Sequence, residues 1–324
     1  MGSLLTYLIR RILFMIPVFL AVSIITFLIT NAAGNPIDLI RIQFKSLPPG
    51  LLKALQDYYH VNDPIFVRYF YWLEEFVTGN LGVSLQTGAP VSTKIGDWIG
   101  TTLELQLAAL FLALGIGVPI GIYSAKHQYS KSDVAVTTTA IFGVSMPTFW
   151  LGIMGILVFS FYLHWLPGNG AISGYPPWWW GSIPLDLLAH AILPVAVLTF
   201  VSIATITRLI RANMLEVLRQ DYILAAKASG VKDSRITYRY ALKNAVTPVV
   251  TIVGLSFGFA LAGAPGLETT FSWPGLGYAF VNAAAVLDLP VVQGITMVIT
   301  LLVLIANLGT DLAYAYLDPR VRLS

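Results

Sequence analysis

The sequence contains no cysteine among its 324 residues, and only 11% of the residues are charged. Without cysteine, the chain can form neither a disulfide framework nor a thiolate metal site or nucleophile. So few charges cannot cover the surface of a soluble protein of this length, in which about a quarter of the residues are charged. Because 56% of the residues are apolar, disorder is also excluded, and the composition indicates an integral membrane protein.

The usual signatures of an energy source or a catalytic centre are missing as well. No glycine-rich stretch ends in Lys followed by Ser or Thr, so the sequence lacks a Walker-type phosphate loop. The four histidines are not spaced as metal ligands, and we expect His190 to be structural. Acidic residues do not recur along the apolar runs, which argues against an ion-coupled carrier. We therefore expect a conduit that is no enzyme, holds no cofactor and receives its energy from another chain.

Six apolar stretches are long enough to cross a bilayer, which takes about 20 residues. They cover residues 12–33, 105–125, 134–163, 187–207, 245–267 and 290–316. Because these runs are continuous rather than alternating, they favour helices over barrel strands. The sequence predicts an all-α integral membrane protein with six transmembrane helices. Its expected parts are the N-terminus with the first helix (1–33), an extracellular loop subdomain (34–100), and a five-helix core (101–324) with a cytoplasmic loop (208–244).

The basic residues are distributed unevenly between the two sides of the membrane. With the N-terminus inside, 14 of the 19 fall in cytoplasmic segments. These are Arg10, Arg11, Lys126, Lys131, Arg208, Arg211, Arg219, Lys227, Lys232, Arg235, Arg239, Lys243, Arg320 and Arg322. The other five lie in the long first outer loop. This positive-inside pattern predicts a multi-pass protein with both termini in the cytoplasm.

Two outer segments carry aromatic patterns. Asp63-Pro64 is typical of the start of a helix, with Asp63 as the N-cap. Gly79 is typical of the end of that helix. Apolar residues follow helical spacing between these points, which fits either a cap packed on the membrane mouth or a surface for a delivery partner. Trp178, Trp179 and Trp180 favour an anchor at the headgroups, with stacking on a sugar or peptide ring as the alternative.

The cytoplasmic loop between the fourth and fifth spans contains a run of small residues. Ala225, Ala226 and Ala228 precede Gly230, which can end a helix in the left-handed conformation. Asp233 or Ser234 can cap a second helix that returns to the bilayer. From the pattern alone, this segment is either an interfacial helix held by anionic lipid or a docking element for a partner.

The motifs of this loop resemble those of a known family. In the loop they are Asp221-Tyr222, Ala225-Ala226, Gly230, the run from Ala241 to Ala245 and the run from Pro248 to Thr251. Elsewhere they include Arg10-Arg11, Arg68-Tyr69, Ser145-Met146-Pro147, the run from Phe271 to Gly277, and Asp318-Pro319-Arg320. Their order and spacing, over nearly the whole chain, resemble the ABC-importer permease subunits of the dipeptide/oligopeptide (peptide/nickel) permease family.

The resemblance implies the permease fold of a type I ABC importer in a prokaryotic plasma membrane. It implies three kinds of protein partner besides lipid: a second homologous permease subunit, two ATPase subunits and an extracellular solute-binding protein. ATP and Mg would be bound by the ATPases, and no nucleic acid is involved. It also implies that the loop forms a coupling helix seated on an ATPase. The coupling residues would be Asp221, Tyr222, Leu224, Ala225, Ala226, Lys227 and Gly230.

Two features of the chain depart from the family pattern. Leu224 stands where the general signature begins with an acidic residue. Pro265-Gly266 interrupts an apolar run, so we expect the fifth span to end or bend near Ala264, as a local change in architecture or a shaped outer gate.

The residues that line a pathway are less well defined by the sequence. Candidate pore-lining residues, which could equally serve helix packing, are Ser145, Met146, Phe149, Ser256 and Phe259. The family handles peptides, and relatives import nickel, glutathione or oligosaccharides, so the substrate stays open. An ion-coupled secondary transporter, a membrane enzyme and a passive channel also fit the composition, but none of them explains the cytoplasmic turn.

Overall fold

The computed structural model describes residues 4–43, 48–173, 183–249, 254, 258, 260 and 263–317. Over these residues the regular structure is helical, apart from an isolated antiparallel bridge between Val83 and Pro90. The contacts divide the chain into two units. Unit 1 holds residues 1–102, 261–265 and 274–324, and unit 2 holds residues 103–260 and 266–273.

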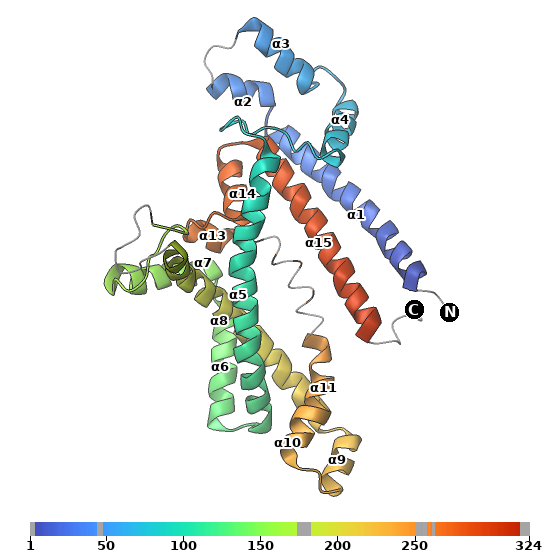
Figure 1. Ribbon diagram of the computed structural model, residues 1–324, viewed down its shortest axis with the longest axis vertical. Helices are drawn as coiled ribbons and strands as arrows, with labels where there is room; N and C mark the ends of the chain where they lie inside the picture. The colour runs from blue at the N-terminus through green and yellow to red at the C-terminus, as the bar shows by residue number, and fades with distance from the viewer. Residues whose placement is uncertain are drawn as a thin grey trace. The chain divides into compact units, whose positions relative to one another are not determined.

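Unit 1 is built on two long helices, α1 and α15, which pack along each other (Figure 1). Its helices are α1 (Leu4–Ala33), α2 (Pro36–Gln43), α3 (Pro49–Tyr58), α4 (Ile65–Val77), α14 (Leu276–Ala285), α15 (Leu289–Leu317) and the first part of α5 (Val91–Lys126). The aromatic rings of α4 rest on α1, where Phe27 contacts Tyr69 and Trp72. The expected helix after Pro64 is therefore present and packs as a cap on a membrane helix.

The expected role of Asp63 in this cap is wrong. The residue before α4 is Pro64, and no side chain caps the helix. The Asp63 carboxylate instead pairs with Nδ1 of His60 at 2.9 Å, because a tight turn with a left-handed His60 (φ 48°) brings the two side chains together. The α4 helix ends within two residues of the expected position, with Gly79 at φ 89°.

Unit 2 contains the rest of α5 and the elements that follow it. These are α6 (Lys131–Ser145), α7 (Thr148–Gly155), a π-helical turn η1 (Ile156–Tyr162), α8 (Ile183–Leu218), α9 (Asp221–Ala228), α10 (Asp233–Arg235), a second π-helical turn η2 (Ile236–Ala241), α11 (Leu242–Ala245) and α13 (Pro265–Thr270). Helix α6 lies along α8 (Figure 1). A buried apolar cluster joins α5 and α8 to α9, η2 and α11.

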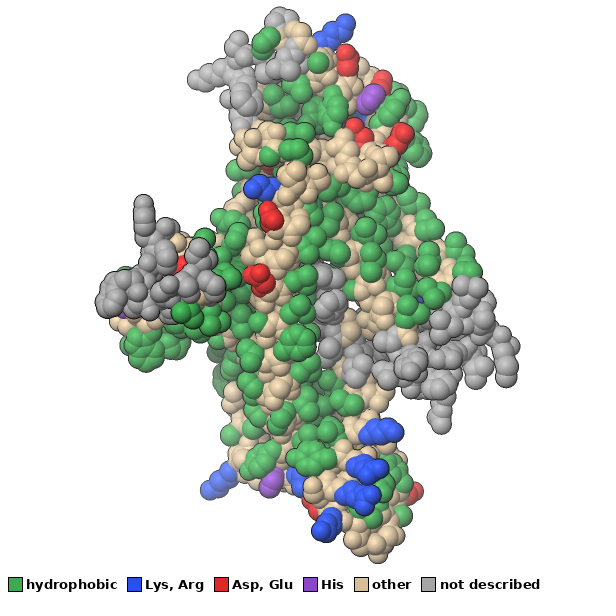
Figure 2. Space-filling view, in the orientation of Figure 1, with side chains coloured by type: hydrophobic (Ala, Val, Ile, Leu, Met, Phe, Trp, Pro, Cys, Tyr) green, Lys and Arg blue, Asp and Glu red, His purple; other side chains and the backbone are tan. Residues whose placement is uncertain are grey.

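Among the described residues, four helices are long and apolar enough to cross a membrane. They cover Leu8–Arg41, Val91–Lys126, Leu185–Leu218 and Leu289–Leu312, and match the expected first, second, fourth and sixth spans. Their apolar side chains cover much of the surface in Figure 2, and Leu13, Phe14 and Phe111 are each more than half exposed. Because water would disfavour such a surface, a lipid environment accounts for it.

The expected third span is not one straight helix. Helices α6 and α7 with η1 pass the test for a span together, but they are bent by 101° at a short break. The break falls at Met146 and Pro147. Proline cannot donate the backbone hydrogen bond that would continue α6, and it disfavours helical geometry in the residue before it.

The expected fifth span, 245–267, falls largely outside the described residues, as do the three consecutive tryptophans 178–180. Its far end is described. The chain leaves helical geometry at Gly263 (φ 81°) and Ala264, and α13 begins at Pro265. The break near Ala264 that the Pro265-Gly266 pair predicts is therefore present.

The contact between α5 and α8 depends on a missing side chain at Gly121. A Cβ there would lie 2.8 Å from Cβ of Ile210 and 2.9 Å from the carbonyl oxygen of Thr207. One turn earlier, the Thr207 hydroxyl donates to the carbonyl oxygen of Gly117 at 3.2 Å. Small residues four positions apart allow such close approach of membrane helices.

We expect Gly121→Ala to destabilise the protein by about 1–3 kcal/mol, because backbone atoms of α8 cannot move aside as a flexible side chain would. Gly115→Ala is the matched control on the same helix, since a Cβ at Gly115 meets nothing within 4 Å. The midpoint of thermal unfolding in detergent measures both effects. Equal midpoints for the two variants would contradict the close contact.

Candidate functional site

The expected coupling residues lie on α9 and on the turn that follows it. Helix α9 is anchored by its buried residue Ile223, which is 0% exposed. Ile223 packs in the apolar cluster with Ile210 and Met214 of α8 and with Ile236 of η2. Burying such a side chain contributes about 1.5–3 kcal/mol, so this anchor sets the position of α9 on the end of α8.

Most of the other expected coupling residues point outward. Asp221, Ala225, Lys227 and Gly230 are exposed, and Ala226 is half-buried. Tyr222 and Leu224 are 42% and 53% exposed, so apolar side chains flank the alanine face. A surface of small side chains bordered by exposed apolar ones allows a second protein to approach the backbone closely. The structure therefore brings these residues together on one exposed element.

The turn after α9 has the geometry that the sequence predicts. Gly230 lies in the left-handed region at φ 74°. The amide of Val231 donates to the carbonyl oxygen of Ala226 at 3.1 Å, and the amide of Gly230 donates to that of Lys227 at 3.0 Å. These two bonds form a Schellman motif, which satisfies the last carbonyls of α9 and turns the chain sharply.

The return segment holds α9 in place and carries most of the local charge. The side-chain amide of Asn244 donates to the Tyr222 hydroxyl at 2.7 Å, which joins α11 to α9. Figure 2 shows Lys and Arg side chains gathered over α9 to α11. The exposed ones are Lys227, Lys232, Arg235, Arg239 and Lys243. This cluster favours an acidic partner surface or anionic lipid.

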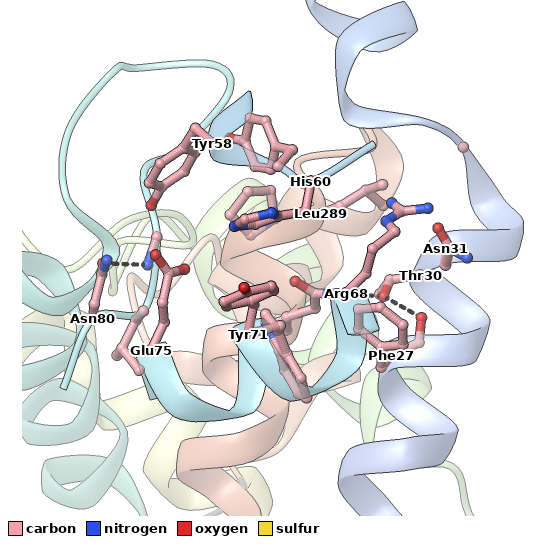
Figure 3. A pocket seen from close by; sticks show the side chains of 17 residues that line it. Phe27, Thr30, Asn31, Tyr58, His60, Arg68, Tyr71, Glu75, Asn80 and Leu289 are labelled. Carbon is pink, nitrogen blue, oxygen red and sulfur yellow. Dashed lines mark hydrogen bonds between the residues drawn. The ribbon is translucent and has the colours of Figure 1, made fainter. Parts of the chain in front are cut away.

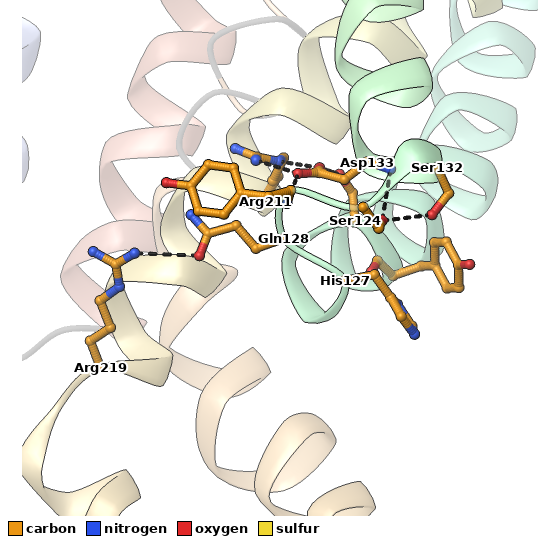
Figure 4. A network of polar contacts seen from close by, with 10 residues as sticks. Ser124, His127, Gln128, Ser132, Asp133, Arg211 and Arg219 are labelled. Carbon is orange, nitrogen blue, oxygen red and sulfur yellow. Dashed lines mark hydrogen bonds and ion pairs between the residues drawn. The ribbon is translucent and has the colours of Figure 1, made fainter.

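An ion pair that the sequence analysis missed lies beside this segment (Figure 4). Nε and Nη2 of Arg211 on α8 donate to the two carboxylate oxygens of Asp133 on α6, at 2.6 and 2.7 Å. The Ser124 hydroxyl and the amide of Tyr129 also donate to this carboxylate. Asp133 is 3% exposed and Arg211 is 23% exposed. Two parallel bonds in a buried position fix α6 against α8 more firmly than a surface pair can.

A second, exposed pair links the same hairpin to the coupling segment. Nζ of Lys126, at the end of α5, lies 2.6 Å from a carboxylate oxygen of Asp233 on α10. The hydrogen bond from Lys126 lowers the pKa of Asp233 below its usual range. Arg219 also donates to the side chain of Gln128 at 3.4 Å. These contacts thus connect the ends of α5, α6 and α8 to the segment from α9 to α11.

The candidate pore-lining residues that the structure describes sit at the bend between α6 and α7. The Ser145 hydroxyl donates to the carbonyl oxygen of Ile141 in its own helix, and Met146 occupies the break. Phe149 on α7 is 49% exposed and faces Gly266 of α13. Ser256 and Phe259 lie outside the described residues.

The remaining polar groups do not form a catalytic or metal centre in the described part of the chain. No three His, Asp or Glu side chains there lie close enough together to hold a metal ion. His190 is 4% exposed, and its Nδ1 lies 2.9 Å from the carbonyl oxygen of Asp186 one turn earlier. This is the structural histidine that the sequence predicts.

Known proteins resemble this chain over most of its length. Residues 117–323 match the family model described as binding-protein-dependent transport system inner membrane component. The oligopeptide transport system permease protein AppB of Bacillus subtilis is 39% identical, over 97% of this chain and 98% of that protein. The dipeptide transport system permease proteins DppB of Alkalihalophilus pseudofirmus and of Escherichia coli K12 are 39% and 33% identical, over 98% of this chain and 99–100% of those proteins. With spans of this kind and a match of this extent, the chain belongs to the family of membrane permease components of binding-protein-dependent transport systems.

Proposed function

We propose that this permease subunit of an ABC importer receives an ATPase subunit on α9 and the Gly230 turn. The observation that carries the proposal is the exposed alanine face of α9, held on α8 by the buried Ile223. Permeases of this family are membrane components without catalytic activity, and they act with ATPases, a second permease and a solute-binding protein. We propose the same set of partners here, with ATP and Mg bound by the ATPases.

The contacts around α9 suggest how movement of an ATPase would reach the membrane. A displacement of α9 would act on α8 through Ile223, and on the α5–α6 hairpin through the Lys126–Asp233 pair. The Asp133–Arg211 pair would make α6 and α8 follow as one body. A coupled switch requires contacts that differ between its two states. We assign these contacts to the surface of α9, and we expect α5, α6 and α8 to move with α9 as a rigid body.

The orientation follows from the charge distribution. With α9 and the five exposed basic residues on and after it on the cytoplasmic side, both termini lie in the cytoplasm of a prokaryotic cell, and α2, α3 and α4 lie outside. The boundaries at residues 33 and 100 then separate an extracellular loop subdomain from the membrane helices.

Peptides are the substrate class that we propose, because the relatives are named as oligopeptide and dipeptide permeases. ATP-driven uptake of a labelled tripeptide into vesicles with the full importer tests this assignment. Uptake of oligosaccharide or nickel alone would replace the substrate class. Uptake driven by an ion gradient without the ATPase would instead indicate a secondary transporter.

Cross-linking tests the docking surface directly, because the chain has no cysteine of its own and each introduced thiol is unique. We expect Ala225→Cys to form a cross-link of short span with an ATPase subunit in the assembled importer. Tyr129→Cys is the control, since Tyr129 is 81% exposed on the α5–α6 hairpin rather than on α9. A cross-link from position 129 but not from position 225 would assign docking to the hairpin instead.

A further inference from the structure

A pocket in unit 1 shares no lining residue with the candidate coupling site or with the candidate pore residues. It encloses about 770 Å³ of empty space, including the part open to solvent. Its walls come from α1, α3, α4, the chain around Asn80 to Gly82 and the start of α15. Figure 3 shows side chains from these elements converging on it. Because the lining mixes aromatic rings with charged groups, the pocket can take a polar ligand that has some apolar surface.

One face of α4 supplies the charged groups. Arg68, Tyr71, Trp72 and Glu75 line the pocket; Tyr71 and Trp72 each lie three or four residues from Arg68 and from Glu75, the spacing of a single helix face. Arg68 and Glu75 are seven residues apart, which places them about 10 Å from each other along the helix axis. In Figure 3 they stand on opposite sides of the His60 and Tyr71 rings. They are therefore too far apart to neutralise each other.

Neither charge has a protein partner in the described part of the chain. Nε of Arg68 is buried and donates no hydrogen bond to a described residue, and the guanidinium forms no ion pair with one. The Glu75 carboxylate likewise forms no hydrogen bond or ion pair with a described residue. Burial lowers the pKa of Arg68 and raises the pKa of Glu75. Burial outweighs the attraction of Asp63 for Arg68 and of His60 for Glu75, and a ligand of opposite charge at each group would offset this cost.

The floor between the two charges is rigid and aromatic. The His60 ring stacks on Tyr71 with centroids 4.0 Å apart and planes 3° apart, and the Asp63 carboxylate holds its Nδ1 at 2.9 Å. Tyr58 and Tyr59 pack edge to face above it, and burial raises the pKa of Tyr59 to about 12. A floor held in this way is ready to receive the backbone and side chains of a ligand.

We propose that this pocket binds short zwitterionic peptides of two or three residues, with the carboxylate at Arg68 and the ammonium at Glu75. An extended tripeptide spans about 10 Å, which matches the separation of the two charges along α4. The guanidinium of Arg68 can form two parallel hydrogen bonds with a carboxylate, and the carboxylate of Glu75 can pair with an ammonium group. Only the choice of ligand rests on the proposed uptake of peptides, because the pocket itself is defined by unit 1 alone.

Binding of trialanine to the purified full chain in lipid nanodiscs, followed by calorimetry, tests the proposal. We expect N-acetyl-trialanine and trialanine amide each to bind at least about tenfold more weakly, since each lacks one charged end. Arg68→Gln should remove the difference between trialanine and its amide, and Glu75→Gln the difference between trialanine and its N-acetyl form. Arg68→Lys should retain part of the affinity, because it keeps the charge without the fork.

Two exposed neighbours serve as matched controls. Glu74→Gln, on the outward side of α4, and Arg41→Gln, on α2, remove the same charges outside the pocket and should leave trialanine binding unchanged. Unfolding midpoints equal to that of the unmodified chain show that the pocket variants are folded. Equal binding of free and end-blocked peptides would overturn the proposal. The absence of trialanine binding would also overturn the proposal. If Glu75→Gln then weakened binding of the solute-binding protein to the permease, we would assign the pocket to a segment of that partner.

The outcome also separates this proposal from the proposed function. Peptide uptake by the full importer with no trialanine binding to the chain would overturn the pocket assignment and leave the transport assignment intact. End-specific binding without peptide uptake would support the pocket and overturn the proposed substrate class.

Discussion

Replacing Arg211 with methionine is expected to lower the free energy of unfolding by about 3–5 kcal/mol, the typical cost of breaking a buried ion pair on one side. Methionine keeps most of the length of the side chain but leaves the Asp133 carboxylate 3% exposed and without its bidentate partner. The remaining donors, the Ser124 hydroxyl and the Tyr129 amide, carry no full charge. Unfolding in mixed micelles with increasing SDS, followed by tryptophan fluorescence, measures the change.

Lys126→Met is the matched control, because it removes a pair whose side chains are 35% and 66% exposed. An exposed pair contributes about 1 kcal/mol or less, so this variant should unfold close to the unmodified chain. Replacing both Asp133 by leucine and Arg211 by methionine should recover most of the lost stability, since no buried charge is left unpaired. If Arg211→Met alone costs less than Lys126→Met, the buried pair does not hold α6 and α8 together.

Ala225→Arg is expected to reduce ATP-driven uptake by at least about 30-fold while the chain remains folded and inserted. Ala225 is exposed on α9, so the new side chain meets solvent in the isolated subunit. In a close interface, the same guanidinium would be buried without a partner, which costs about 2–5 kcal/mol. Uptake of labelled tripeptide into vesicles, with the amount of inserted permease measured in parallel, tests this expectation.

Two further variants separate the effect of bulk from that of backbone geometry. Ser234→Arg adds the same side chain to an exposed position on α10 and should leave uptake nearly unchanged. At Gly230, which lies at φ 74°, asparagine tolerates the left-handed region and valine does not. Gly230→Val should therefore impair uptake much more than Gly230→Asn. Normal uptake by Ala225→Arg would show that α9 is not where the ATPase docks.

Local patterns in the sequence were sufficient for the long helices and for the coupling turn. Continuous apolar runs predict spans because the bilayer core leaves a chain few ways to satisfy its backbone, and four of the six runs are described as long helices. Gly230 after a run of alanines predicts a helix end in the left-handed conformation, because glycine adopts that conformation readily. The Schellman hydrogen bonds of Gly230 and Val231 follow from this conformation.

Features that depend on pairs distant in the sequence could not be predicted. Asp133 and Arg211 are separated by 78 positions, and nothing near either residue specifies the other. An aspartate at the start of one apolar run and an arginine at the end of another were the available signals. The 101° bend at Pro147 was also missed, because a proline inside an apolar run is compatible with anything from a slight kink to a full break.

The pocket on α4 was overlooked for a different reason. The apolar spacing of this helix predicts its packing on α1 but not the pocket beside that contact, which Phe27 and Trp72 also line. The spacing of the pocket-lining residues Arg68, Tyr71, Trp72 and Glu75 was present in the sequence. Its meaning depended on α3 and the start of α15, which close the pocket from other parts of the chain.

The distance between Asp133 and Arg211 along the chain has a consequence for synthesis. At roughly 5–20 residues per second, the ribosome needs about 4 to 16 s to extend the chain by the 78 positions from Asp133 to Arg211. Throughout that interval the Asp133 carboxylate has no Arg211 to pair with. The buried Asp133–Arg211 contact between α6 and α8 can therefore form only after α8 has been made, as a late step of biogenesis.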